Sequence, residues 1–510
     1  MIPSLGIAGV FEQACRWKGE QPFLLDSYVR WTGREAWRQA RTVASALRAK
    51  GVAKGSVVGF FCLPSARHAV AFFACQMLGA VCCALHTKDT DLRLQKALGR
   101  IGAEVLIGDS DQSRRLSGIA GAAAKAPLIV HLDRSQPGSD DLAASDDMAS
   151  SLETTPISPN DTAVLFFSSG STGDPKCVVH SQKTVLETAF AGSLVYGVSD
   201  PSDGVSIPMS PSFAAWLHTV LPFVALRGKI FFHDAFDPLD YLETLAAEGM
   251  TVAALVPSVW NMVLGQEFSG DMTRLRMAFY SGEKGSTKLI RELAAFAPAV
   301  RTAYLATEGG CAAGIVAPHE VLVGRDLPTA VGQPIPGADL KLIDPEGGFD
   351  DVVAPGQTGE VAISGGSLAL GYLGDDLLTR AQFHDGWWRS GDLGVLDEQG
   401  LLTIRGRKDN RINTGGIKVH AEEIENVLLS HPAVRGAAVI GAEDAEFGQR
   451  IEAHLVVDDA SVTPSDVLSY CERSRMLPRA LLPKAIHFHP ELPTSPTGKL
   501  YRKGLSKSEA

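Results

Sequence analysis

The apolar positions in the first third of the chain change their period in a regular way. Residues 34–51 carry apolar side chains at helical spacing, residues 56–62 form a short continuous apolar run, and residues 65–81 return to helical spacing. Short apolar runs follow at residues 103–109 and 126–133. Because buried strands that alternate with helices are typical of parallel sheets covered on both faces, the pattern predicts α/β layers.

The alternation pauses at residues 134–161, which are rich in Ser, Asp and Pro and lack an apolar period, so we expect a surface loop there. It then resumes. The next predicted strands are residues 162–169, 229–234, 251–258 and 276–282, with a helix at residues 237–250.

Glycine-rich turns become dense between residues 331 and 394, which is typical of β-hairpins. A helical pattern at residues 421–432 and an apolar run at residues 435–442 then open a smaller α+β unit. We therefore predict an α/β protein with two domains. Residues 1–408 would form a large domain of parallel-sheet α/β layers with a β-rich subdomain, and residues 409–510 a small α+β domain.

Composition narrows the function classes. The 510 residues are 45% apolar and 21% charged, as in a globular protein, and the net charge of −11 disfavours binding to nucleic acid. No run of eighteen apolar residues occurs, and no basic start precedes an apolar core at the N-terminus, so we expect neither a membrane span nor export. The eight cysteines lack metal-ligand spacing, which favours reduced thiols and a cytoplasmic location.

One loop combines the chemical groups that bind phosphate. SSGSTGDPK, from Ser168 to Lys176, follows an apolar strand and offers glycine backbone N–H groups, several hydroxyls and a lysine. The alternative is a flexible Gly/Ser turn. It is no Walker loop, because Pro175 precedes the lysine and Cys177 follows it, and no GxGxxG follows a strand elsewhere.

Further motifs follow in a fixed order: YLATE at residues 304–308, WWRSGDLG at 387–394, GRKDNRINTGGIKV at 406–419 and PTSPTGK at 493–499. Together with the loop they resemble the adenylate-forming superfamily, which includes acyl-CoA synthetases, carrier-protein adenylation domains and luciferases. The resemblance implies that a carboxylate attacks the α-phosphate of ATP with loss of pyrophosphate, and that the acyl group then passes to a thiol. Such chemistry needs charge neutralisation because two anions must meet.

The resemblance also implies a role for each residue that matches a motif. Thr307 would donate to the α-phosphate, Glu308 would bind Mg²⁺, and Lys499 would bridge the carboxylate and the phosphate during adenylation. The implied ATP contacts are Ser168, Ser169, Gly170, Ser171, Thr172, Gly173 and Lys176 for the phosphates, Tyr304 with the backbone of Gly282, Glu283 and Lys284 for adenine, and Asp392 with Arg407 for ribose. Taken singly, these residues are also typical of caps, turns, core positions and solvated tails.

Two reactions in one site require movement, because Lys499 must leave before a thiol can enter. The resemblance implies rotation of the small domain about Asp409, after which Gly415 and Gly416 would leave room for a pantetheine arm. The same two glycines are also typical of a hairpin turn.

The acid pocket departs from the family pattern. Leu305 stands where relatives have glycine, which predicts a shortened or reshaped pocket, and Gly309 borders the same pocket. Phe213 aligns with a pocket aromatic and Ala214 with its variable partner. Since alanine cannot pair with an ammonium group, an α-amino acid is disfavoured. Cys177 and Asn413 also differ from the usual Gly and Lys.

These features predict an ATP-dependent ligase that joins CoA to a carboxylic acid with an apolar or aromatic body. One alternative is a free-standing adenylation protein that loads the phosphopantetheine of an acyl carrier protein. Another is a non-catalytic nucleotide-binding relative, which the joint presence of Lys176, Thr307, Glu308, Asp392 and Lys499 disfavours. The acid and the oligomeric state, monomer or homodimer, stay open.

Overall fold

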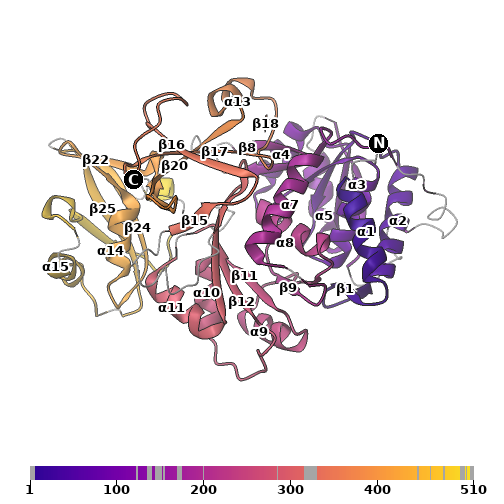
Figure 1. Cartoon of the computed structure of the whole chain (residues 1–510), viewed down its shortest axis with the longest axis horizontal. Coiled ribbons are helices and arrows are strands. Elements are labelled where there is room, and N and C mark those ends of the chain that lie inside the picture. The colour runs from indigo at the N-terminus through magenta and orange to yellow at the C-terminus, as the bar shows by residue number, and fades with distance from the viewer. Residues whose placement is uncertain are drawn as a thin grey trace. The chain divides into compact units, whose positions relative to one another are not determined.

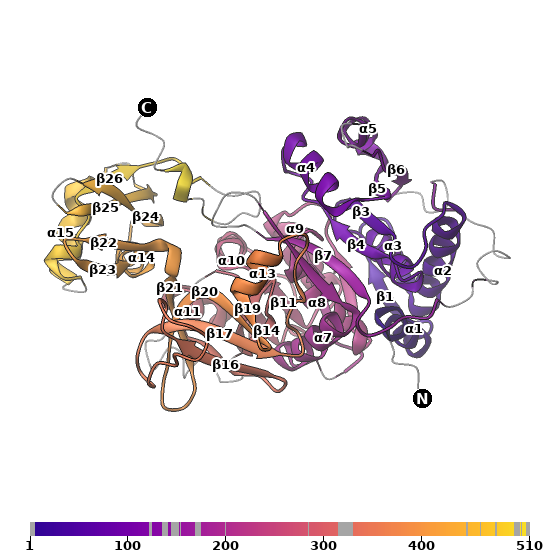
Figure 2. The ribbon, with the colours of Figure 1, turned by 90° about the horizontal axis from the view of Figure 1, so that it is seen from above.

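The computed structural model describes residues 6–121, 125–134, 141–143, 152, 155–168, 175–198, 200–283, 285–314, 330–444, 447–459, 461–474, 477–493, 500 and 502–505. The chain packs as two compact units. The first comprises Met1–Leu340 and Ile363–Trp388, and the second comprises Lys341–Ala362 and Arg389–Ala510. Figures 1 and 2 show their elements from two directions. The boundary at residue 409 lies inside the second unit and stays a prediction about which part of the chain rotates.

The first unit contains a mostly parallel sheet of buried strands. Its described strands are β3 (Val57–Phe61), β4 (Val81–Ala84), β5 (Val105–Asp109), β6 (Leu128–Leu132), β7 (Thr162–Ser168), β8 (Lys176–Ser181) and β18 (Gly371–Tyr372). They lie in the order β18-β8-β7-β4-β3-β5-β6. From β7 to β6 the pairing is parallel, whereas β8 runs antiparallel to both β7 and β18.

A second sheet of this unit is also mostly parallel. Its described strands are β1 (Pro22–Leu25), β2 (Arg30–Thr32), β9 (Gly204–Ile207), β10 (Lys229–Phe232), β11 (Val252–Leu255), β12 (Met277–Ser281), β13 (Ala299–Ala306), β14 (Gly310–Gly314) and β15 (Ala330–Pro334). Their order is β15-β14-β13-β12-β11-β9-β10-β1-β2. The strands from β13 to β1 are parallel, and β14, β15 and β2 pair antiparallel at the two ends.

Helices cover both sheets. The described helices of the unit are α1 (Ile7–Lys18), α2 (Gly33–Ala49), α3 (Ala66–Met77), α4 (Asp91–Ile101), α5 (Ser113–Gly121), α7 (Gln182–Tyr196), α8 (Ala214–Ala225), α9 (Pro238–Ala247), α10 (Pro257–Leu264), α11 (Thr287–Phe296) and α13 (Asp376–Gln382). All residues of α3 are buried, because this helix shares one apolar core with α1, α2, α7, α8 and strands of both sheets. α4 and α5 cover the other face of the first sheet, and α9 to α11 that of the second.

The β-rich part of the chain and the C-terminal part follow. The first has β16 (Ala338–Ile343), β17 (Gly359–Gly365), β20 (Trp387–Leu396) and β21 (Leu402–Arg407), adjacent in that order, with β19 (Phe383–His384) beside β20. The C-terminal part has β22 (Arg411–Thr414), β23 (Ile417–His420), β24 (Val434–Asp444), β25 (Gly448–Val457) and β26 (Ala485–Phe488), with helices α14 (Ala421–Leu429) and α15 (Pro464–Ser474) on one face.

The predicted fold class is therefore confirmed: parallel α/β layers, a β-rich part and a small α+β part. Much of the predicted loop at residues 134–161 lies outside the described residues. Among the helices that the structure describes, none combines the length and apolar composition needed to span a membrane. All eight cysteine side chains are buried and free of disulfides.

Candidate active site

A tight turn joins β13 to β14 and carries Thr307 and Glu308. The turn depends on Gly310, whose φ of 63° lies in the left-handed region. A Cβ atom there would stand 2.6 Å from Cβ of Ser367 and 2.8 Å from Oγ1 of Thr188, so a side chain would clash. The Ser367 hydroxyl also donates to the Gly309 carbonyl at 2.9 Å, which fixes the turn from outside.

The backbone of Thr307 and Glu308 is held by two further donors. The amide of Ala369 donates to the Glu308 carbonyl at 2.8 Å. Nε2 of buried His180 lies 2.7 Å from the Thr307 carbonyl, and Nδ1 lies 3.0 Å from the Thr184 hydroxyl. Burial lowers the pKa of His180 to about 4, so its ring is neutral. A carbonyl only accepts, so Nε2 carries the proton and Nδ1 accepts from Thr184.

The Glu308 side chain is the centre of a polar cluster from distant parts of the sequence. Glu308 is only 8% exposed, and its Oε1 accepts from the Ser168 hydroxyl at 3.1 Å and from the Tyr372 hydroxyl at 3.2 Å. Nε1 of Trp388 lies 3.4 Å from the same Tyr372 hydroxyl. Nζ of Lys176 sits 5.2 Å from the centre of the Tyr372 ring, within reach of a cation–π contact. The predicted residues Ser168, Lys176 and Glu308 are thus brought together.

The two ends of the SSGSTGDPK loop are fixed by strand pairing. Ser168 ends β7, Lys176 begins β8, and the two residues face each other in the antiparallel ladder. Nη1 of Arg100, at the C-terminal end of α4, donates to the Pro175 carbonyl at 2.6 Å. The loop residues between them, Ser169, Gly170, Ser171, Thr172 and Gly173 among the predicted contacts, lie outside the described residues.

The chemistry of this cluster suits both an anion and a hard cation. Lys176 supplies a positive charge, while Glu308 and Ser168 supply oxygen atoms. Both described hydrogen bonds to the carboxylate reach Oε1, and no described hydrogen bond or ion pair reaches Oε2. Mg²⁺ is typically held in proteins by one or two carboxylates together with water and substrate phosphates. The residues present therefore fit a Mg²⁺ ion held by Glu308.

The predicted ribose residues pair with each other in the second unit. Asp392 of β20 faces Arg407 of β21, and Nη1 of Arg407 lies 3.0 Å from the Asp392 carboxylate and 3.2 Å from the Ser390 carbonyl. Gly391 has a φ of 74°, and a Cβ atom there would stand 3.0 Å from the Arg407 guanidinium. The glycine therefore leaves room for the pair.

The predicted hinge residue is flanked by two anchored cations. Asp409 is exposed within a 3₁₀ turn, Lys408–Asn410. Nζ of Lys408 donates to the Pro345 carbonyl, and Nη2 of Arg411 lies 3.1 Å from the Glu346 carboxylate. Lys408 and Arg411 are thus tied to the loop that follows β16, while Asp409 itself is exposed.

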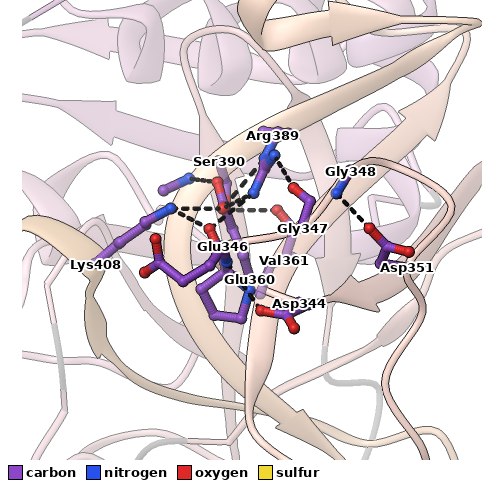
Figure 3. Close-up of polar contacts among 12 residues, drawn as sticks. Asp344, Glu346, Gly347, Gly348, Asp351, Glu360, Val361, Arg389, Ser390 and Lys408 are labelled. Carbon is purple, nitrogen blue, oxygen red and sulfur yellow. Dashed lines mark hydrogen bonds and ion pairs between the residues drawn. The ribbon is translucent and has the colours of Figure 1, made fainter. Parts of the chain in front are cut away.

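The Glu360 carboxylate lies between the side chains of Arg389 and Lys408, as Figure 3 shows. Its Oε2 accepts from Nη2 of Arg389 at 2.5 Å and lies 3.9 Å from Nζ of Lys408, and its Oε1 accepts from the Gly391 amide at 3.2 Å. Arg389 also donates to the Gly347 carbonyl at 2.9 Å. One buried carboxylate therefore connects the start of the RSGDLG motif to the residue before the predicted hinge.

The glycines of the predicted thiol passage form a hairpin turn. Gly415 and Gly416 join β22 to β23 with φ values of 56° and 82°, which only glycine adopts readily at two successive positions. Both are exposed, and a Cβ atom at Gly416 would meet nothing within 4 Å. This confirms the hairpin alternative and is compatible with the proposed passage.

Several of the residues predicted to contact adenine or the acid lie on β13 or at the start of α8. Tyr304 is buried on β13, and a bulge separates it from half-buried Leu305. Phe213 precedes α8 with its ring 5.2 Å from that of His86. Ala214, the first residue of α8, is buried. None of the described contacts joins Phe213 to Leu305, so the acid pocket stays a prediction.

Three other predicted positions have local roles. Gly282 follows β12 with a φ of 82°, and Glu283 accepts from both the amide and the hydroxyl of Ser258 in α10. A Cβ atom at Gly309 would lie 3.1 Å from Ile363 and 3.3 Å from Trp388, so the turn packs tightly there. Lys284 and Lys499 lie outside the described residues.

Sequence reasoning did not find His180, Tyr372 or Ser367, because their roles depend on contacts across more than fifty residues. It also did not find a Ser206–His233–Asp240 hydrogen-bond series, with distances of 2.6 and 3.1 Å. Ser206 is fully buried, so this series resembles a hydrolytic triad in connectivity but gives a substrate no access.

Comparison with known proteins identifies the family of the chain. Residues 11–373 match the family model "AMP-binding enzyme", and residues 423–499 match "AMP-binding enzyme C-terminal domain". A feruloyl-CoA synthase from Amycolatopsis sp is 30% identical over 480 residues, covering 92% of each chain. A fatty acid–[acyl-carrier-protein] ligase, ScoC, from Streptomyces coeruleorubidus is 29% identical over 486 residues, covering 92% of this chain and 89% of ScoC. The crystal structure of ATP-bound MatB from Rhodopseudomonas palustris shares the fold, with a TM-score of 0.86, 24% identity and 98% coverage of both chains.

Proposed function

The chain belongs to the AMP-binding enzyme family, and we propose that it is an AMP-forming acid–thiol ligase. It would join a carboxylic acid to the α-phosphate of ATP, release pyrophosphate, and pass the acyl group to the thiol of CoA. The observation that carries the proposal is the meeting of Ser168, Lys176 and Glu308 around Tyr372. A cation, hydroxyl groups and a buried carboxylate at one place suit a nucleotide triphosphate with its metal ion.

In the first reaction the described residues would bind and orient ATP. Lys176 and Ser168 would face the β- and γ-phosphates, and Thr307 would donate to the α-phosphate from a turn held by His180. Mg²⁺, held by Glu308, would supply additional neutralisation of phosphate charge. Lys499 would then bring the acid carboxylate against the α-phosphate, because two anions approach each other only when a cation lies between them.

In the second reaction the C-terminal part would rotate about Asp409 and replace Lys499 with the Gly415–Gly416 turn. The exposed position of Asp409 and the open surface at Gly416 support this proposal. The anchor at Lys408 would hold the residue before the hinge in place, whereas the ion pair between Arg411 and Glu346 would open as the C-terminal part rotates. A pantetheine arm could then pass along a surface that carries no side chain.

The acid would have an apolar or aromatic body. Ala214 offers no partner for an ammonium group, and the aromatic Phe213 and half-buried Leu305 would favour apolar contacts. Relatives named for feruloyl-CoA and for a fatty acid are consistent with this class. The carrier-protein ligase among the relatives keeps a carrier-protein thiol as the second candidate acceptor.

The test is a pyrophosphate-release screen of aryl, short-chain, medium-chain and long-chain acids, each with ATP and with CoA, a carrier protein or no thiol. We expect acid-dependent pyrophosphate release and thioester formation with CoA. If thioester forms only with the carrier protein, the carrier protein and not CoA is the acceptor. The absence of pyrophosphate release with every acid would contradict the ligase proposal.

The Lys499→Ala variant is the control that separates the two reactions. It should lose about a hundredfold or more in acid-dependent pyrophosphate exchange. It should still convert a supplied acyl-adenylate into thioester, because Lys499 has left the site by then. Equal loss of both reactions would contradict the proposed rotation.

A further inference from the structure

Three histidines and a glutamate, none of which has been given a role above, gather on one face of the C-terminal sheet. Glu452 and His454 are two residues apart on β25, so their side chains point to the same face. β26 runs parallel to β25 with His487 beside His454, and His489 follows two residues later. The neighbouring positions Ala453, Leu455 and Phe488 point to the opposite face, where they pack in the core with α14 and α15.

The ligand atoms of this group are close together. One nitrogen or oxygen atom each from Glu452, His454 and His487 lies within 4.8 Å of the other two. Nε2 of His487 is 4.0 Å from Oε2 of Glu452, and the His454 and His487 rings stack with centroids 4.9 Å apart. Nδ1 of His454 lies 2.9 Å from Nε2 of His489, which holds the central ring in place.

His454 carries the second observation. His454 is only 3% exposed, yet its Nε2 atom has no hydrogen-bond partner among the described residues. A buried polar atom without a partner is costly, and native proteins rarely leave one unless water or an ion satisfies it. An ordinary surface histidine would direct this nitrogen to solvent, which the burial of His454 prevents.

We propose that Glu452, His454 and His487 bind a divalent transition-metal ion of the zinc class. Imidazole nitrogen with one carboxylate oxygen is a donor set that proteins use for Zn²⁺, in contrast to the all-oxygen sets of Mg²⁺ and Ca²⁺. His489 acts as the outer partner that orients His454. The site shares no residue with the Mg²⁺ site proposed at Glu308, and it does not depend on the ligase proposal.

Binding requires a small inward movement of the ligands. Ligand atoms around tetrahedral Zn²⁺ stand about 3.4 Å apart, against a spread of up to 4.8 Å here. The His487 side chain is 38% exposed, so it has room to turn towards His454. Nε and Nη2 of Arg450 bind Oε1 of Glu452 at 2.7 and 2.6 Å, which leaves Oε2 on the side of His487.

Metal binding would fasten β26 to β25, because it joins side chains of both strands. β26 is a four-residue strand, so a link of this kind would hold a short segment in place. The site is therefore expected to stabilise the C-terminal part rather than to take part in acyl transfer. A ligand that binds only the folded state raises the thermal midpoint in proportion to the logarithm of its concentration.

The experiment titrates the full-length chain, stripped with a chelator, with Co²⁺ alone and then with Zn²⁺ alone. We expect one equivalent of Co²⁺ with the visible absorption of a four-coordinate ion, displacement by Zn²⁺, and a higher thermal midpoint with Zn²⁺. His487→Gln changes a half-exposed side chain and Glu452→Gln a buried one, both on the face opposite the apolar core, and each should weaken binding at least about tenfold. His384→Gln, an exposed histidine of the first unit, is the matched control and should bind like the wild type.

Two results would overturn the proposal. The first is a wild-type chain that takes up no Co²⁺ or Zn²⁺ beyond what His487→Gln takes up. The second is one bound equivalent with an unaltered affinity in both the His487→Gln and Glu452→Gln variants, which would place the ion elsewhere. Far-UV circular dichroism of each variant identifies a loss of binding that results from unfolding, and the folded variant of the pair then decides the outcome.

Discussion

Tyr372 offers a sharp test of the candidate active site, because its hydroxyl and its ring make separate contacts. The hydroxyl donates to Oε1 of Glu308 at 3.2 Å, and the ring lies under Nζ of Lys176 at 5.2 Å. Tyr372→Phe removes the first contact and keeps the second. Tyr372→Leu removes both, so the two variants together separate the hydrogen bond from the cation–π contact.

The magnitude follows from the nature of the lost hydrogen bond. A hydrogen bond to a charged group contributes about 1.5–3 kcal/mol. Ser168 still donates to the same oxygen in the Phe variant, so Glu308 keeps one partner. If the orientation of Glu308 matters in the adenylation transition state, kcat/KM for pyrophosphate release should fall about 10- to 100-fold, since about 1.4 kcal/mol corresponds to a factor of ten. Tyr372→Leu should lose a further factor of about two to five, from roughly 0.5–1 kcal/mol of cation–π energy.

The assay is ATP–pyrophosphate exchange with a saturating acid at several Mg²⁺ concentrations. Tyr372→Phe should need more Mg²⁺ for half-maximal exchange, because the carboxylate is less well oriented. Ser168→Ala removes the other donor, and the double variant should lose more than the sum of the two single losses. Wild-type exchange within twofold in Tyr372→Phe, with an unchanged Mg²⁺ requirement, would refute this account of Glu308.

Three further predictions test other parts of the structure. Leu305→Gly should admit bulkier acids in the pyrophosphate-release screen, and an unchanged acid profile would exclude Leu305 from the pocket. Burial raises the pKa of Asp109 from 3.8 to about 7, so its contribution to stability is full below pH 3.8 and is lost as pH rises towards 7. The free energy of unfolding of Asp109→Asn, relative to that of the wild type, should therefore rise by up to about 4 kcal/mol between pH 3.8 and pH 7. Thermal midpoints of both proteins measured from low to neutral pH check this prediction. A difference between the two proteins that does not change with pH would contradict it. All eight cysteines are buried, and burial raises the pKa of Cys177 to about 11. Iodoacetamide should therefore label the native chain far more slowly than the urea-unfolded chain. Rapid labelling of Cys177 in the native state would contradict its described environment.

The sequence predicted those elements whose burial is visible in a local pattern. The apolar runs at residues 56–62 and 103–109 became β3 and β5, because strands buried on both faces need apolar residues at every position. α14 and β24 likewise occupy the predicted ranges. The short strands β1 and β2 were not predicted, since three or four residues carry too little periodicity to distinguish a strand from a loop.

The candidate site was predictable only as far as motifs reach. Ser168, Lys176 and Glu308 were named from their motifs, whereas Tyr372 was not, because a tyrosine in a glycine-rich stretch has no signal of its own. The histidine cluster shows the same limit. His487 and His489 alternate at strand spacing, as do Glu452 and His454, but only the parallel pairing of β25 and β26 brings the two pairs together.

The arrangement around Tyr372 also explains how opposite charges can stay available in one site. Among the described ion pairs none joins Lys176 to Glu308, although both side chains contact Tyr372. A direct salt bridge would neutralise both groups, and each would have to be separated from the other before it could bind phosphate or metal. Neutral hydroxyl donors on Glu308 and an aromatic face under Lys176 stabilise each charge without consuming it. Tyr372 therefore contacts both the cation and the carboxylate without a described ion pair between them, which suits the proposed binding of a nucleotide triphosphate with its metal ion.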